Sequence, residues 1–117
     1  MLVRRLVLPV LLTVVVLTAF AARAFARSPV AVVASNWKFT PATITVPAGE
    51  PTTLRLASSE GVHGIQSDAL GLKQTVIVPG KFVEVTFTPS KAGTYPVHCS
   101  VMCGAGHADM VLTVEVK

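Results

Sequence analysis

From residue 30 onward, short runs rich in β-branched residues alternate with turns that contain glycine and proline. Val, Ile and Thr account for 27 of the 91 residues in 27–117, and no segment keeps the roughly 3.6-residue apolar period of an amphipathic helix. We predict about seven strands at the spacing typical of a sandwich, at 30–35, 43–47, 52–57, 73–78, 81–88, 94–99 and 111–116. The pattern predicts an all-β Greek-key sandwich or barrel.

Residues 1–26 differ from the rest of the chain in hydropathy. Two arginines precede an apolar stretch from Leu6 to Ala22, and the tripeptide Ala-Phe-Ala that ends at Ala26 has the pattern of a signal-peptidase site. We therefore expect a signal peptide at 1–26 and one domain at 27–117. An uncleaved membrane anchor is the alternative, since about 17 apolar residues reach the short end of the spanning range. Both place the domain in the periplasm or on the outer face of a bacterial cytoplasmic membrane.

The composition of residues 27–117 is that of an ordinary globular domain. Hydrophobic residues number 20 in 1–26 and 40 in 27–117, about 44% of the latter part. Residues 27–117 also hold 7 Lys and Arg against 6 Asp and Glu, a net charge of +1. Because no run of basic residues follows that would track a phosphate backbone, we expect no nucleic-acid binding.

Residues 99–110 concentrate the side chains that bind metals. The stretch reads Cys-Ser-Val-Met-Cys-Gly-Ala-Gly-His-Ala-Asp-Met, so it offers two thiols, an imidazole and a thioether between two predicted strands. A further histidine, His63, is expected in the loop after the third strand. Loops that are distant in sequence gather at one end of a Greek-key sandwich, which would bring His63 to this stretch. Sulfur and imidazole ligands together suit copper.

Cys99 and Cys103 allow two other interpretations. In an oxidising compartment two cysteines form a disulfide by default, but a bridge that closes so short a loop stabilises little. Two cysteines and two histidines also make a structural zinc set, but Met110 would then be left over, and a thioether favours copper. We therefore favour copper.

The ligand pattern resembles one known family. Cys-x-x-x-Cys-Gly-x-x-His-x-x-Met, with an isolated His-Gly 36 residues before the first cysteine, resembles the CuA domain of cytochrome c oxidase subunit II. Nitrous oxide reductase carries a related domain. The resemblance covers nearly all of residues 30–117 and extends to Trp37, Phe39, Pro41, Gly49, Val78-Pro79-Gly80 and Gly93-Thr94-Tyr95.

This resemblance implies a cupredoxin fold with two copper ions that are bridged by two cysteine sulfurs. Each of the two histidines would cap one copper, while the methionine and one backbone carbonyl would be weak ligands to one copper each. The implied ligands are His63, Cys99, Val101 (through its carbonyl), Cys103, His107 and Met110. Bridging spreads one unpaired electron over both metals, so bond lengths change little on reduction, and a rigid sandwich holds the ligands in place.

The implied function is electron transfer from a donor such as cytochrome c to a terminal oxidase or another reductase. Such a protein is not catalytic alone, although within an oxidase it would be the electron-entry subunit. Oxidase subunits commonly carry an acidic residue at the position of Val101, and residues 1–26 have room for one membrane helix where many subunit II chains have two. We therefore expect a free-standing or singly anchored carrier.

Three alternatives stay open at this point. One is a periplasmic Cu(I) carrier that uses Cys99, Cys103 and Met110. Another is a mononuclear blue-copper protein that uses His63, one cysteine, His107 and Met110. The last is a disulfide-linked sandwich without metal.

Three nearby residues are assigned to the structure rather than to the site. His98 faces the opposite side of its strand from Cys99 and is expected at the surface. Trp37 and Tyr95 are expected in the core.

Overall fold

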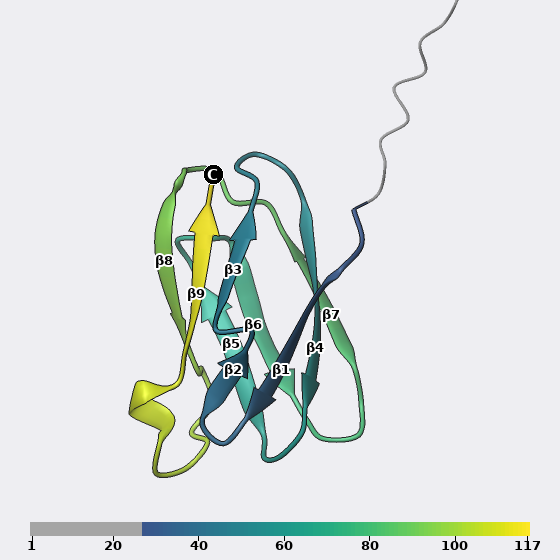
Figure 1. Ribbon diagram of the computed structural model, residues 1–117, viewed down its shortest axis with the longest axis vertical. Helices are drawn as coiled ribbons and strands as arrows, with labels where there is room; N and C mark the ends of the chain where they lie inside the picture. The colour runs from purple at the N-terminus through teal and green to yellow at the C-terminus, as the bar shows by residue number, and fades with distance from the viewer. Residues whose placement is uncertain (1–26) are drawn as a thin grey trace, which may run out of the picture.

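The computed structural model describes residues 27–117, and these residues form an all-β fold. Within them lie nine strands and one short 3-10 helix (Figure 1). Their bounds are β1 (Val30–Ser35), β2 (Lys38–Thr40), β3 (Thr43–Val46), β4 (Thr52–Ser58), β5 (His63–Ser67), β6 (Leu72–Ile77), β7 (Val83–Phe87), β8 (Gly93–His98), η1 (His107–Asp109) and β9 (Val111–Val116).

The predicted signal peptide or anchor at 1–26 lies outside the described residues, so the boundary after Ala26 stays a prediction. Among residues 27–117, no helix has the length and apolar character needed to cross a membrane.

The strands form three sheets. One has the order β2-β1-β4-β7, the second has the order β3-β9-β8, and β5 pairs with β6 in a two-stranded sheet. Two of the pairings are parallel and join segments far apart in the chain: β1 runs beside β4, and β3 runs beside β9. In each pair, at least one strand of another sheet lies between the two partners along the chain.

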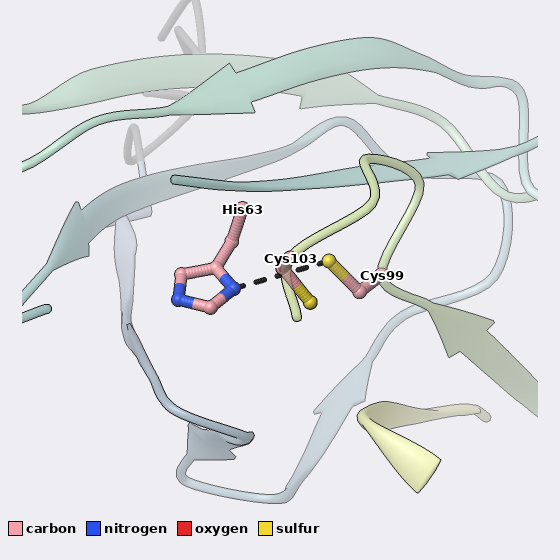
Figure 2. A group of neighbouring side chains, drawn as sticks. All are labelled: His63, Cys99 and Cys103. Carbon is pink, nitrogen blue, oxygen red and sulfur yellow. Dashed lines mark hydrogen bonds between the residues drawn. The ribbon is translucent and has the colours of Figure 1, made fainter. Parts of the chain in front are cut away.

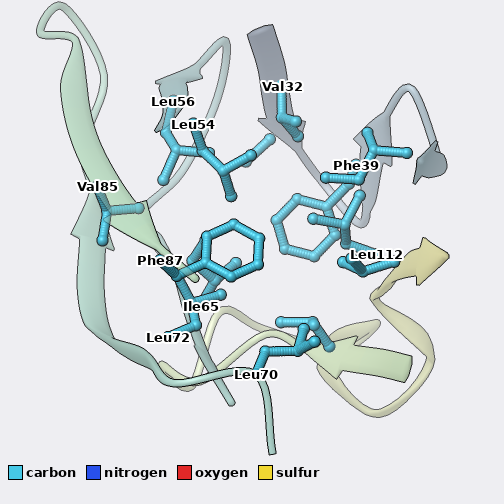
Figure 3. Packing of buried hydrophobic residues seen from close by; sticks show 14 of the residues in the cluster. Val32, Phe39, Leu54, Leu56, Ile65, Leu70, Leu72, Val85, Phe87 and Leu112 are labelled. Atoms are coloured by element: carbon cyan, nitrogen blue, oxygen red, sulfur yellow. The ribbon is translucent and has the colours of Figure 1, made fainter. Parts of the chain in front are cut away.

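The core lies between these sheets (Figure 3). Strand β4 shows how the sequence builds it, because alternate residues of a strand point to opposite faces. Leu54 and Leu56 point inward and are fully buried, whereas Arg55 between them points outward. Leu112 of β9 and Ile65 of β5 meet them from the other sheets, and both are fully buried.

Two strands were not predicted from the sequence. β2 has three residues, too few for a recognisable alternation. β5 begins with His63 and Gly64, which have low strand propensity, and it forms because it pairs with β6, with His63 opposite Ile77. The expectation that His63 lies in a loop is therefore wrong: it is the first residue of a strand.

The two aromatic residues expected in the core differ from each other in the structure. Tyr95 is half-buried against the core, and its hydroxyl donates a hydrogen bond to the carbonyl of Lys91 at 2.8 Å. Trp37 is 40% exposed and lies in the turn between β1 and β2, so its assignment to the core was wrong. His98 is exposed, as expected.

The loop that contains η1 lies at one end of the sandwich, and the C-terminus lies at the other (Figure 1). Strand β5 holds this loop in place. Ile65 and Cys99 form an isolated antiparallel bridge, and the backbone N–H of Ser100 donates to the carbonyl of Gly64 at 3.0 Å. The residues with metal-binding side chains therefore rest on a strand of the core.

Candidate metal centre

Three of the predicted site residues form a compact group. The ligand atoms of His63, Cys99 and Cys103 all lie within 4.8 Å of one another. Figure 2 shows the imidazole of His63 facing the two sulfur atoms, with a dashed line between His63 and Cys99. His63 and Cys99 are buried, and Cys103 is half-buried.

Cys99 directly follows β8 and is fixed from two sides. Its backbone N–H donates to the carbonyl of Met110 at 3.0 Å, next to the start of β9. On its other side it bridges to Ile65 of β5. The side chain of Cys99 is therefore held by the β-structure, although the residue lies outside the bounds of a strand.

Gly64 lets the loop approach β5 closely. A Cβ atom at this position would lie 2.7 Å from Ser100 Oγ, 2.7 Å from Val101 Cγ2 and 3.2 Å from the carbonyl oxygen of Thr75. No ordinary side chain fits between the loop and the strand. The His-Gly pair therefore combines a candidate ligand with the space that the cysteine loop needs.

The hydrogen bond of His63 determines which ring nitrogen can bind a metal. Nε2 lies 2.8 Å from the carbonyl oxygen of Glu60, and a carbonyl only accepts, so Nε2 carries the proton and donates it. In the neutral ring Nδ1 then has a free lone pair. Nδ1 lies 3.9 Å from Cys99 Sγ, so the free nitrogen faces the sulfur pair.

The other candidate ligands surround Cys103. His107 Nδ1 lies 3.4 Å from Cys103 Sγ, and Met110 Sδ lies 3.8 Å from the same sulfur. The helix η1 makes this possible, because it turns the chain between these residues: the N–H of His107 donates to Gly104, and the N–H of Met110 donates to His107.

Val101 completes the set through its backbone. The thiol of Cys99 donates to the carbonyl of Val101 at 3.2 Å. The structure thus brings all six predicted site residues together, in two halves. One half is His63 with Cys99 and the carbonyl of Val101, and the other is Cys103 with His107 and Met110.

Both cysteines are free thiols in this structure. Burial, the hydrogen bond with Cys99 and the charge of Cys99 together raise the pKa of the Cys103 thiol from 9.0 to about 11. Cys103 is therefore protonated at neutral pH. A metal ion that binds this sulfur has to displace the proton.

The donor set fits copper. Two thiols and the His63 imidazole lie within 4.8 Å of one another, the His107 imidazole and the Met110 thioether lie within 3.8 Å of one of these thiols, and the compact group contains no carboxylate among the described residues. Hard cations such as magnesium and calcium require oxygen ligands, whereas sulfur with imidazole suits copper. Met110 is fully buried, so its thioether is kept from water.

Sequence reasoning missed two residues at this centre. The indole N–H of Trp37 donates to the carbonyl of Cys103 at 2.9 Å, and Glu60 holds the ring of His63 through its carbonyl. Trp37 is among the residues that carry the resemblance, but nothing in its spacing indicated the site. Glu60 gave no signal, since any residue has a backbone carbonyl.

Comparison with known proteins identifies the family. The cupredoxin-like domain family matches residues 8–114 of the chain. This chain belongs to the cupredoxin-like domain family. Cytochrome c oxidase subunit 2 of Thermus thermophilus is 31% identical to it over 86 residues, which are 74% of this chain and 63% of the relative. The cupredoxin therefore spans less than two thirds of that relative's length.

Two solved structures have a similar fold. A heme-copper terminal oxidase dimer, determined by cryo-EM, aligns with a TM-score of 0.65 and 25% identity over 74% of this chain and 63% of that one. The periplasmic domain of subunit II of the cytochrome oxidase of Bradyrhizobium japonicum aligns with a TM-score of 0.68 and 16% identity over 76% of this chain and 83% of that one. The predicted cupredoxin fold and the resemblance to subunit II are confirmed. In this cupredoxin His63, Cys99 and Cys103 lie near one another as in a CuA site.

Proposed function

We propose that this cupredoxin is a copper electron-transfer protein with a CuA-type binuclear centre. It passes single electrons between a donor such as cytochrome c and a terminal oxidase or reductase. The observation that carries the proposal is the arrangement of two free thiols next to each other, with His63 on one side and His107 on the other. Two sulfurs between two imidazoles provide for two metal ions rather than one.

The proposed ligands take their positions from the fold. They are His63 Nδ1, Cys99 Sγ, the Val101 carbonyl, Cys103 Sγ, His107 Nδ1 and Met110 Sδ. Bound copper supplies reversible one-electron chemistry. The chain contributes burial, since His63, Cys99 and Met110 exclude water, and it contributes rigidity through β5 and β9. Ligands that stay in place in both redox states keep the reorganisation on electron transfer small.

The proposed partner is a redox protein of an oxidase system. The names of the relatives support this, because they are a cytochrome c oxidase subunit 2 and the periplasmic domain of an oxidase subunit II. The second of these names also supports a location outside the cytoplasm, on the periplasmic side. A signal peptide or anchor at 1–26 agrees with that location.

The experiment counts metal ions and electrons in the full chain. The reduced chain is loaded with Cu(II) and desalted, copper per chain is measured by elemental analysis, and the loaded protein is titrated with a one-electron reductant. We expect two coppers per chain and one electron accepted by the pair. One copper per chain supports a mononuclear blue-copper site if it is EPR-active, and a Cu(I) carrier if it is EPR-silent. A chain that binds no copper overturns the proposal.

A matched pair of variants tests the ligand assignment. Cys99→Ser removes one of the two sulfurs and leaves the other ligands, so we expect loss of the two-copper form. Met102→Leu is the control, because Met102 lies in the same loop but is 80% exposed. A Cys99→Ser variant that still holds two coppers contradicts bridging by both sulfurs.

A further inference from the structure

The turn between β1 and β2 contacts the Cys103 half of the candidate metal centre and the loop that orients His63. It consists of Asn36 and Trp37, which are adjacent in the chain. His63 and Cys103 lie on different segments, β5 and the loop after Cys99. A single two-residue turn that reaches both segments is placed to control their separation.

Trp37 holds the Cys103 half. Its indole N–H donates to the carbonyl of Cys103 at 2.9 Å. Its ring also lies close to the loop, because a Cβ at Gly106 would lie 2.5 Å from Trp37 Cγ, and a Cβ at Gly104 would lie 3.1 Å from the ring. The glycines thus allow the indole to press on the segment that carries Cys103.

Asn36 holds the His63 half through the loop before β5. Its backbone N–H donates to Glu60 Oε1 at 3.0 Å, and its side-chain oxygen lies 2.7 Å from the position that a Cβ of Gly61 would take. The carbonyl of Glu60 in turn accepts the hydrogen bond from His63 Nε2 at 2.8 Å and one from the hydroxyl of Ser58 at 3.0 Å. Asn36 therefore positions the residue that orients the imidazole.

We propose that this turn is a clamp that sets the distance between the two halves before copper binds, with Trp37 and Glu60 as positioning residues. Asn36 and Trp37 are consecutive in the chain and cannot separate, so the loop around Cys103 and the loop around Glu60 are both attached to the same turn. That turn is rigid because β1 is paired on both sides, with β2 and with β4. The effect on copper rests on the proposed function, whereas the clamp itself is a property of the metal-free chain.

The first test replaces Trp37, one of the two positioning residues, in the full chain. Trp37→Phe keeps a ring but removes the N–H donor to a ligand's backbone, and we expect copper affinity to fall about tenfold with a changed EPR and visible spectrum. The control is Phe82→Leu, because Phe82 is also an exposed aromatic residue but stacks with Arg55. Trp37→Phe with wild-type affinity and spectrum overturns the proposal.

The Glu60 variants test the other arm of the clamp. Glu60→Ala removes the acceptor for Asn36, and we expect about threefold weaker copper binding. Glu60→Gln keeps an acceptor oxygen and is expected to rescue the wild-type affinity and spectrum. If Trp37→Phe fails to fold, the two Glu60 variants test the clamp by themselves. A Glu60→Ala variant with the copper affinity and spectrum of the wild type contradicts the clamp.

A double-mutant cycle isolates the contact between the turn and the loop. Gly106→Ala places a methyl group where the ring lies, so we expect it to weaken copper binding and to shift the spectrum. In a Trp37→Ala background the methyl group meets no ring, and Gly106→Ala should then have little further effect. If the losses of copper affinity caused by Trp37→Ala and Gly106→Ala are strictly additive, the indole ring does not press on the loop.

A metal-free measurement separates the two proposals. Amide hydrogen exchange in the reduced apo chain follows His107 and Met110, whose N–H groups bond within the loop. We expect faster exchange at both in Trp37→Phe and no change in Phe82→Leu. Unchanged exchange in Trp37→Phe overturns the clamp even if the wild type binds two coppers. A wild type that binds no copper overturns the proposed function, and the exchange result still decides on the clamp.

Discussion

Replacing Gly64 with alanine is expected to weaken the fold and the copper site together. The new Cβ would lie 2.7 Å from Ser100 Oγ and from Val101 Cγ2, about 0.7 Å short of ordinary contact, which begins near 3.4 Å. The carbonyl of Thr75 at 3.2 Å prevents the methyl group from moving toward β6. The side chains of Ser100 and Val101 therefore have to shift, and we expect the loop that carries them and Cys99 to shift with them.

The magnitude follows from overpacking. One methyl group forced into a packed interior costs about 2 kcal/mol in the free energy of unfolding. For a domain of this size, such a loss lowers the melting temperature by roughly 8–16 °C. We also expect a weaker copper site with an altered EPR spectrum, since two of the proposed ligands shift.

The assay is thermal and urea unfolding of the reduced apo chain, followed by copper loading. Ser100→Ala supplies the matched background, because Ser100 Oγ is buried and has no hydrogen-bond partner among residues 27–117. Removing it alone is expected to be neutral or mildly stabilising. It also removes one of the two close contacts, so Gly64→Ala should cost less in that background. Wild-type stability and spectrum in Gly64→Ala would refute the reasoning.

Three further predictions concern other parts of the chain. Met110→Leu keeps the buried volume, so we expect it to lower the free energy of unfolding by less than about 1.5 kcal/mol. The loss of the thioether donor is expected to raise the reduction potential of the copper site. A wild-type potential in a redox titration would argue against a ligand role for Met110. Leu54→Ala removes a fully buried side chain of β4 and is expected to lower the unfolding free energy by about 2–5 kcal/mol in urea, so a near-zero loss would contradict its place in the core. Because the pKa of Cys103 is raised from 9.0 to about 11 in the folded chain, its protonated thiol stabilises the apo protein below pH 9, and this contribution is lost as the pH rises through 11. Urea midpoints across that range measure the loss, and the same fall in Cys103→Ser would exclude Cys103 as its source.

The sequence predicts those strands whose local pattern decides their structure. Strand β9 (Val111–Val116) was predicted with its exact bounds, because its residues alternate between buried and partly exposed and nothing in the segment competes with a strand. Strand β5 could not be predicted in this way. Its first two residues favour no strand, and it forms through pairing with β6, which lies later in the chain. Pairing of that kind has no local signature.

The same division holds at the candidate site. The spacing from Cys99 to Met110 is visible in the sequence because all of these candidates lie in one loop. His63 lies 36 residues away and was placed near them by the rule that distant loops gather at one end of a sandwich. The roles of Trp37 and Glu60 at the site could not be predicted from the sequence, because both residues act through backbone carbonyls. Trp37 donates to the carbonyl of Cys103, and Glu60 accepts through its own carbonyl. A backbone acceptor leaves no mark in a sequence.

The most direct test of the account is the EPR spectrum of the full chain loaded with copper(II) after reduction of its two thiols. The account places the sulfurs of Cys99 and Cys103 between two imidazoles. It therefore predicts hyperfine structure from one electron shared equally between two copper nuclei. A spectrum from a single copper nucleus, at any ratio of copper to chain, would contradict it.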